Sequence, residues 1–502
     1  MIASTGPRTS LASMDQLKSR PAPLMGTLAA IALCVVVPLV IVASTDSASP
    51  NPSWGWALLA TAIAGARFSW IVASASRRLY EMTTWLFFYL FMGLAPMVQL
   101  RQQVDPGTTQ NLLHEFDEAA FAIIIASQLL LMVGSHLGKL STPDGPSPAR
   151  RVVNASRTRW VSLFILAGAA AVAVNLGPGL FGSRAQRNGA VNALIGDEAL
   201  RALVVGFVTL GLLTAVVAQF EVRRQRKAIG STAPLLLLAV STILLLVIVN
   251  PLSSPRFLLM TVVLGLLAAA GLYRTASAFR AVAVSAVLGM LVLFPVLDSF
   301  RGRVGAVQAV DPLGALKESD FDAFGQLLNT ITYVEAHDIT WGNQFLGVLL
   351  FWVPRSIWPG KPIDTGILLA EDRGYWFTNI SAPLPAELYI NGGWVALVAG
   401  MLAIGFFLRR WDDRNEMKLR ILGVPTILGC VIPFYLVLLF RGSMLQAAAN
   451  LGVILFVWFL VTSRSKQPVG DLPAPRGVSL SRSQIPTTSR WSRADRRMLA
   501  GD

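Results

Sequence analysis

The sequence predicts an all-α polytopic membrane protein with about twelve membrane-spanning helices, eleven at the fewest and thirteen at the most. Three observations lead to this fold class. The 502 residues are 54% hydrophobic and only 14% charged, and the mean hydropathy is +0.58. Apolar runs of about 18 to 22 residues, the length that crosses a bilayer, recur along the chain. Long polar stretches lie only at the two ends and in one internal segment.

The spans follow one another with short connections, apart from that internal segment. The first run is not followed by a small-residue cleavage site and a polar mature region, so we expect an anchor and not a cleaved signal. Nine runs precede the long polar segment and three follow it. In chain order we expect spans at 24–44, 54–75, 82–100, 118–137, 160–176, 201–220, 233–250, 257–273, 281–298, 389–408, 421–440 and 444–462.

The net charge of +14 is explained by topology. If the N-terminus is inside, the cytoplasmic segments hold well over half of the 42 Lys and Arg residues, and the outer segments hold most of the 28 Asp and Glu residues. This is the positive-inside bias, and it predicts that both termini are cytoplasmic. The basic charge therefore does not indicate a nucleic-acid partner.

The same map divides the chain into five regions. Residues 1–23 are predicted to form a polar cytoplasmic tail, and 463–502 a disordered basic cytoplasmic tail, because both are rich in Ser, Pro and Arg. Residues 24–298 are predicted to form a nine-helix membrane region, and 389–462 a three-helix one. Between them, 299–388 form a long loop on the periplasmic or extracellular side, and outer loops of that length are usually functional.

The long outer loop contains a predicted re-entrant segment near 345–362. Its apolar part, Phe345–Val353, is too short to span a bilayer and ends in a turn with three prolines and a glycine. Arg355 and Lys361 lie in this turn among tryptophans. Irregular backbone is tolerated at membrane depth only where protein or a water-filled cavity surrounds it. Two fixed cations there predict a site for an anionic lipid headgroup.

Arginines recur on the outer side, where the positive-inside tendency should deplete cations. The structural alternative for each is interfacial anchoring or pairing with an outer acid. The functional interpretation is diphosphate binding, since a guanidinium binds phosphate oxygens bidentately and stays charged. No cluster of residues at metal-ligand spacing appears, so neither a metal nor another cofactor is expected. The candidate cations are Arg184, Arg187, Arg256, Arg301, Arg303, Arg355, Lys361 and Arg441.

Three outer residues are candidates for a general base. They are Asp322, His337 and Glu387. A sugar hydroxyl acceptor needs a base within hydrogen-bond reach, and histidine or a carboxylate can serve. The structural alternatives are a solvated or paired histidine, and for Glu387 a carboxylate placed at a helix N-terminus by the helix dipole.

The stretch from Phe345 to Trp394 resembles the bacterial oligosaccharide repeat unit polymerases, the Wzy-type O-antigen and exopolysaccharide polymerases. The similar features are Pro-Arg-Ser-Ile-Trp-Pro-Gly-Lys-Pro, ending at Pro362, and Ser-Ala-Pro-Leu-Pro-Ala-Glu-Leu-Tyr-Ile-Asn-Gly-Gly-Trp, ending at Trp394. The exit of the third span and the arginine after Asn-Pro, Arg256, are also similar.

The resemblance implies a GT-C-like fold in the bacterial cytoplasmic (inner) membrane. It implies a glycosyltransferase for polysaccharide biosynthesis in the cell envelope, which polymerises repeat units carried on a polyprenyl diphosphate such as undecaprenyl diphosphate. The transfer takes place at the outer face of that membrane, without metal or nucleotide sugar. Membrane lipid, a chain-length regulator and a flippase are the further partners that it implies.

Carried onto this chain, the resemblance assigns a role to each group. Arg355 and Lys361 hold one lipid diphosphate, and Arg256, Arg301 and Arg303 assist or hold the second. The aromatic residues that contact sugars or lie at the headgroup level are Trp352, Trp358 and Trp376.

Two alternative functions stay open. An O-antigen-type ligase, which transfers finished glycan to another acceptor, shares the long outer loop with its histidine and arginines. A lipid-linked sugar flippase or other transporter predicts charged residues along a transmembrane path. The predicted spans are almost free of Asp, Glu, Lys and His. Arg67, the exception among cations, lies toward the cytoplasmic half of its span and is expected to be structural.

Overall fold

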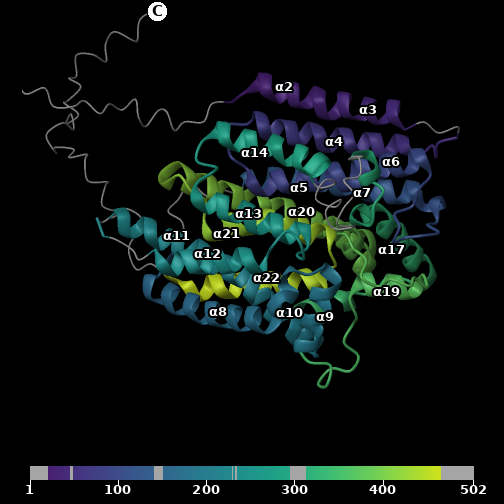
Figure 1. Ribbon diagram of the computed structural model, residues 1–502. Coiled ribbons are helices and arrows are strands. Elements are labelled where there is room, and N and C mark those ends of the chain that lie inside the picture. The colour runs from purple at the N-terminus through teal and green to yellow at the C-terminus, as the bar shows by residue number, and fades with distance from the viewer. Residues whose placement is uncertain are drawn as a thin grey trace, which may run out of the picture.

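The computed structural model is a bundle of helices that lie side by side, with α2 and α3 along one edge and α8 along the opposite edge (Figure 1). The structure describes residues 21–45, 49–140, 151–228, 230–231, 235–293 and 312–464. Arg301 and Arg303, two of the candidate cations, lie outside the described residues, as does most of both predicted tails.

The helices up to the long outer loop follow the predicted apolar runs, except α9, which lies between two of them. They are α2 (Pro23–Ile31), α3 (Val37–Ser44), α4 (Trp54–Ala73), α5 (Leu79–Tyr89), α6 (Ala95–Gln102), α7 (Asp117–Leu140), α8 (Ala155–Leu176), α9 (Arg184–Leu194), α10 (Glu198–Gly206), α11 (Leu212–Ala228), α12 (Leu236–Ile248), α13 (Arg256–Ala270) and α14 (Ala276–Leu288). Short π-helical turns join α2 to α3 and α5 to α6, just before Pro38 and Pro96. A proline lacks the backbone N–H that would close the preceding turn, which accounts for the wider turn.

The remaining helices are α16 (Pro312–Ala315), α17 (Ala323–His337), α18 (Asn343–Leu349), α19 (Thr365–Asp372), α20 (Leu384–Leu422), α21 (Ile427–Arg441) and α22 (Met444–Val461). Helices α17 and α19 lie at one end of the bundle, at the right in Figure 1. The predicted long outer loop is therefore partly helical.

Within the described residues, eight helices or continuous helix pairs are long and apolar enough to cross a membrane. Four shorter apolar helices, α12, α13, α14 and α21, coincide with the other predicted runs. The all-α polytopic membrane class is confirmed by these helices. A GT-C-like arrangement and a total of twelve spans stay predictions.

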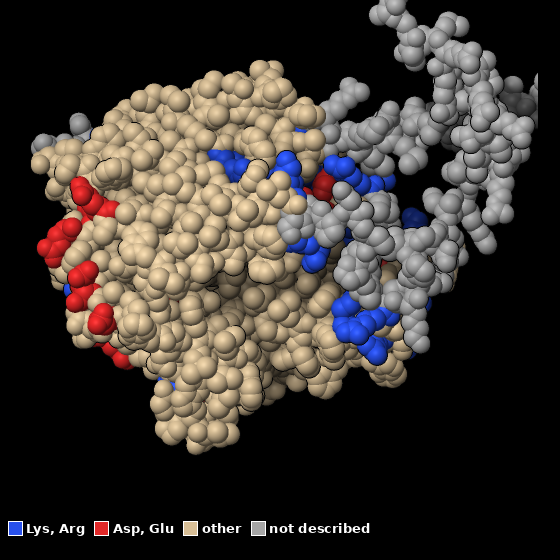
Figure 2. Space-filling view, turned by 180° about the vertical axis from the view of Figure 1, so that it is seen from behind, with Lys and Arg blue, Asp and Glu red and all other residues tan. Residues whose placement is uncertain are grey.

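Charged residues separate along the bundle. Figure 2 shows Asp and Glu gathered at one end, Lys and Arg gathered at the other, and a broad uncharged surface between them. The acidic end is the one that holds α17 and α19, and the basic end holds the two short strands. The segregation agrees with the charge map of the sequence, whereas the side that faces the cytoplasm stays a prediction.

The two strands, β1 (Arg151–Val153) and β2 (Thr462–Arg464), form an antiparallel ladder that the sequence did not predict. Asn154 N–H also donates to Val461 O at 2.9 Å. The Arg151 side chain donates to Thr462 Oγ1 and to the carbonyl oxygens of Phe459 and Thr462. The ladder thus ties the start of α8 to the end of α22.

Helices α7 and α20 pack with their backbones in close contact through glycines. A Cβ on Gly138 would lie 2.6 Å from Phe406 O, and a Cβ on Gly134 would overlap Leu402 O. On the other helix, a Cβ on Gly405 would overlap Leu131 O. Glycines four residues apart let membrane helices approach in this way.

Helix α20 is broken near the acidic end. Gly392 and Gly393 have non-helical backbone angles, and Gly393 has φ 57°. The carbonyl oxygens of Ile390 and Asn391, which the break releases, accept the N–H groups of Thr340 and Gly342 at 2.8 Å each. The loop before α18 therefore satisfies the backbone of the broken helix.

Buried ion pairs join helices near the basic end. Arg67 donates to Glu81 at 3.0 Å and to Ser135. Arg77, which is almost fully buried, pairs with Glu416 at 2.9 Å. These contacts agree with a structural role for Arg67.

Candidate functional site

Two predicted arginines from distant parts of the chain meet at one carboxylate at the acidic end. Arg256, the first residue of α13, lies 2.5 Å from Asp320 Oδ2. Arg441, the last residue of α21, lies 3.7 Å from Asp320 Oδ1 and donates to Asp320 O at 2.7 Å. Asp320 retains 21% of its side-chain exposure. The pair of guanidinium groups is therefore held at the surface by an accessible anion.

Asp322 is a second carboxylate that contacts Arg441. Its Oδ1 accepts Arg441 Nη2 at 3.2 Å and Ser381 Oγ at 2.7 Å. Burial raises the pKa of the Asp322 carboxyl, because the charged form is disfavoured away from water. The Arg441 guanidinium and the Ser381 donors lower the pKa, but by less than burial raises it.

A third arginine reaches the same region from α9. The Arg187 side chain is buried and donates to Ser254 Oγ at 2.6 Å and Ser253 Oγ at 3.2 Å. These serines lie two and three residues before Arg256, in the loop that leads into α13. Asn250 orders that loop by accepting the N–H groups of Leu252 and Ser253.

We call the group formed by Arg187, Arg256, Arg441, Asp320 and Asp322 the arginine cluster. It draws on α9, the start of α13, the end of α21 and the segment before α17. Arg184 is exposed at the first residue of α9. The sequence singled out the arginines by their position on the outer side, but it did not identify Asp320 as the group that joins two of them.

Arg355 and Lys361 lie elsewhere, in the loop that follows α18. Lys361 Nζ donates to Phe351 O at 2.6 Å and Val353 O at 3.0 Å, and Arg355 donates to Lys361 O at 2.6 Å. Burial, and secondarily the Arg355 charge, lower the pKa of Lys361. Both cations therefore hold the turn together, while Arg355 stays exposed.

This loop lies beside α22 and not beyond its end. The Phe351 ring would lie 3.2 Å from a Cβ on Gly452, which is well inside α22. At 1.5 Å per residue, Gly452 lies about 12 Å from the first residue of that helix. In Figure 1 the green segment before α19 projects from the helical body.

The predicted aromatic contacts differ in exposure. Trp352 is 64% exposed and Trp376 is 84% exposed. Trp358 is half-buried, and its carbonyl accepts Lys361 N–H at 3.1 Å.

His337 does not join the arginine cluster. Its Nε2 lies 2.7 Å from Asp372 Oδ1, and its ring packs on Tyr333 with centroids 4.8 Å apart. Asp322 precedes the first residue of α17 and His337 is the last. Fifteen residues of helical rise separate the two by about 22 Å. A single base site cannot contain both.

Glu387 lies where three helices begin. Its side chain is buried, and its two oxygens accept Thr365 Oγ1 and Met444 N–H, each at 2.8 Å. Thr365 and Met444 are the first residues of α19 and α22, and Glu387 itself lies in the first turn of α20. Helix dipoles stabilise an anion at such a position. Glu387 thus has a clear structural role.

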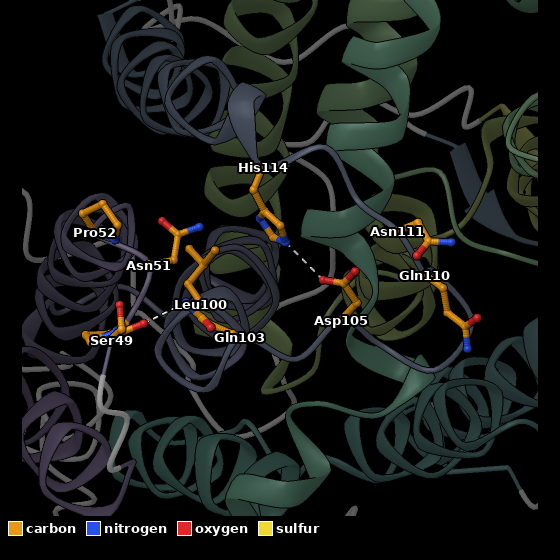
Figure 3. Close-up of a pocket in the computed structure, with 10 residues that line it drawn as sticks. Ser49, Asn51, Pro52, Leu100, Gln103, Asp105, Gln110, Asn111 and His114 are labelled. Atoms are coloured by element: carbon orange, nitrogen blue, oxygen red, sulfur yellow. Dashed lines mark hydrogen bonds and ion pairs between the residues drawn. The ribbon is translucent and has the colours of Figure 1, made fainter.

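A polar pocket that the sequence did not predict opens at the same end, beside α4, α6 and the start of α7 (Figure 3). Its volume is about 790 Å³. Figure 3 shows His114 in contact with Asp105 in its lining.

Comparisons with protein-family models, curated proteins and solved structures found no match to this chain.

Proposed function

We propose that the protein polymerises polyprenyl-diphosphate-linked oligosaccharide repeat units into a surface polysaccharide. The reaction is a metal-independent glycosyl transfer at the outer face of the bacterial cytoplasmic membrane. The observation that carries this proposal is the meeting of Arg256 and Arg441 at Asp320, at the acidic end of a membrane bundle. Arg187 binds the serines just before Arg256. In a region with mostly acidic side chains, two guanidinium groups that share one anion suit a polyanionic ligand.

In this proposal the carrier diphosphate replaces Asp320 as the partner of Arg256 and Arg441. The exposure of Asp320 gives a ligand access to that position. An acceptor hydroxyl attacks the anomeric carbon of the growing glycan, and the bond from that carbon to the diphosphate oxygen breaks. The diphosphate leaves with the electron pair, and preorganised guanidinium groups stabilise the charge that develops on it.

The proton of the acceptor hydroxyl goes to a base, for which Asp322, Glu387 and His337 are the candidates. Asp322 is favoured because it contacts Arg441 at 3.2 Å, and Arg441 is one of the arginines proposed to bind the leaving diphosphate. Arg355 and Lys361 take the second carrier diphosphate through N–H groups that the turn does not use. The loop beside α22 is the proposed re-entrant segment, and both chain termini are proposed to be cytoplasmic.

The experiment uses the purified protein in proteoliposomes with lipid-linked repeat units, and product length is measured on gels. We expect Arg256→Gln and Arg441→Gln each to slow polymer formation about 100-fold or more, the usual effect of removing one charge-stabilising donor. Arg226→Gln, near the basic end, is the matched control and should retain wild-type rates. Normal chain lengths from both cluster variants would contradict the proposal.

The same assay separates the alternatives. A polymerase yields longer glycans that remain on the carrier, whereas a ligase releases the carrier and leaves the length of the glycan unchanged. A flippase moves the lipid-linked substrate across the bilayer and makes no new glycosidic bond.

A further inference from the structure

The polar pocket in Figure 3 carries an inference about the substrate. Its walls come from the segment before α4, the end of α6, and the loop that joins α6 to α7. About 790 Å³ lies within the range of about 300–1,000 Å³ that is common for small-molecule sites. The polar side chains that line it are Ser49, Asn51, Gln103, Gln110, Asn111 and Asp105 with His114.

The charge of the pocket disfavours a phosphate. His114 lies between two carboxylates, 3.2 Å from Asp105 Oδ1 and 3.1 Å from Asp117 Oδ1. Asn51 Nδ2 donates to the other oxygen of Asp117 at 2.7 Å. Among the described residues that line the pocket there is no Lys or Arg. The two carboxylates raise the pKa of His114 to about 10, and even with this imidazole protonated the three groups carry a net negative charge, so the ligand is not an anion.

The side chains that remain for a ligand are neutral amides. Gln110 and Asn111 have exposed side chains, and their backbone carbonyls are held by Tyr375 Oη and by the Arg373 guanidinium. Gln103 and Asn111 both have positive φ, at 51° and 57°. A fixed backbone therefore presents amides that both donate and accept hydrogen bonds, beside the apolar floor of Leu100 and Pro52.

The pocket is also connected to the arginine cluster. Gln99, beside Leu100 in α6, donates through Nε2 to Leu316 O at 2.8 Å and to Phe321 O at 3.0 Å. Phe321 lies between Asp320 and Asp322. One helix end therefore forms a wall of the pocket and contacts the segment that carries both cluster carboxylates.

We propose that this pocket is a glycan subsite, which binds uncharged, hydroxyl-rich sugar units. Sugar hydroxyls can donate to the carboxylates and can both donate to and accept from the amides, and the apolar face of a sugar ring suits the side chains of Leu100 and Pro52. The inference rests on the proposed function for the source of the glycan: the pocket would hold sugars of the repeat unit whose diphosphate binds the arginine cluster.

The binding test uses the full-length protein in nanodiscs and saturation-transfer NMR. The probes are neutral trisaccharides of glucose, galactose, mannose, rhamnose and N-acetylhexosamines. Inorganic pyrophosphate, followed by the broadening of its 31P signal, is the probe for the arginine cluster. We expect at least one trisaccharide to bind, and Gln110→Ala and Asn111→Gly to weaken it about tenfold, the loss of one or two hydrogen bonds. Glycine at 111 removes the amide and keeps the positive φ.

Two controls make the result specific. Gln225→Ala removes an exposed amide from α11 near the basic end and should bind the sugar as the wild type does. Pyrophosphate binding should be unchanged in both pocket variants. The proposal is overturned if no trisaccharide binds, if the pocket variants bind as the wild type does, or if the pocket takes up Ca²⁺ or Mg²⁺ in place of sugar.

The two proposals fail in distinguishable ways. If the wild type binds a trisaccharide through Gln110 but forms no polymer, the glycan subsite stands and the polymerase function is wrong. If the wild type forms polymer and Gln110→Ala does so with unchanged KM and kcat, the function stands and the subsite is wrong. A raised KM with unchanged kcat is the expected result for a subsite that binds substrate and transition state equally.

Discussion

The Glu387 carboxylate lies where the N-termini of α19, α20 and α22 meet, and this setting decides how its variants should behave. A carboxylate that accepts a backbone N–H and a hydroxyl at 2.8 Å stabilises the fold whether or not it takes part in the reaction. A glutamine has the same shape but places an N–H₂ group against one of these donors.

We therefore expect Glu387→Gln to lower the free energy of unfolding by about 1–3 kcal/mol, from the lost dipole interaction and one unsatisfied donor. Melting temperature and polymer formation should be measured on the same proteoliposomes. A catalytic base gives the opposite pattern, with polymer formation lost and the melting temperature unchanged, and that outcome would show that the structural role is secondary.

Asp322 gives a pH dependence whose sign follows from its burial. Because its pKa is raised in the folded protein, it binds a proton more tightly there than in the unfolded chain. Its contribution to stability is therefore present in acid, and is lost as the pH rises from the ordinary carboxyl pKa through the raised one.

Asp322→Asn removes this titration. Relative to the wild type, the variant should gain melting temperature as the pH is raised from about 4 to about 7. The control is Asp338→Asn, which removes a carboxylate from an exposed position with little change of side-chain shape. A difference in melting temperature between Asp322→Asn and the wild type that does not change with pH would contradict the raised pKa.

The sequence identified the cations by the side of the membrane on which they are predicted to lie. It did not identify the residues that these cations contact. Arg256 and Arg441 were predicted because they lie on the cation-poor side, whereas their shared contact with Asp320 depends on the path of the chain between α13, α17 and α21. Asp322 and His337 lie close in the sequence, but they stand at opposite ends of α17. The length of this helix separates them in space. A rule about which side a residue occupies carries no information on such distances.

Helices α7 and α20 pack backbone against backbone because glycines remove the side chains between them. Adding a methyl group to Gly134 requires one helix to move away from Leu402 O. We expect Gly134→Ala to lower the free energy of unfolding by about 1–3 kcal/mol, the usual effect of overpacking.

The matched control is Gly168→Ala in α8, where nothing lies within 4 Å of the added Cβ. There alanine should leave stability unchanged or raise it by about 0.5–1 kcal/mol, since it favours the helix. Thermal melting of the purified variants measures both. Equal effects at Gly134 and Gly168 would show that α7 and α20 do not touch as described.

The apolar runs were sufficient to predict most helices. The hydropathy of a run indicates burial in lipid, and its length indicates whether it can cross the bilayer. They did not predict the break at Gly392 and Gly393, because both glycines lie inside a run that is apolar on either side. The break depends on the loop from Thr340 to Gly342, about fifty residues away, which binds the released carbonyls.

The whole molecule has an acidic and a basic end, and a topology experiment decides which faces the cytoplasm. In a variant that lacks Cys34 and Cys430, a cysteine is introduced at Trp376, shortly after α19 at the acidic end, or at Gln225, in the last turn of α11 toward the basic end. We expect a membrane-impermeant maleimide to label Trp376→Cys in spheroplasts, and Gln225→Cys only after permeabilisation. The reverse pattern would place the arginine cluster in the cytoplasm and contradict the proposed reaction.

The ladder between β1 and β2 has a consequence for how the chain is made. Arg151 and its partner Thr462 lie 311 positions apart, so the ribosome has to finish almost the entire protein before the first strand finds the second. Until then α11 can pack against α8 and β1, but the first strand lacks its ladder partner. Closure of this small sheet therefore has to wait for the end of synthesis, and a message that stops before residue 462 yields a bundle without the ladder.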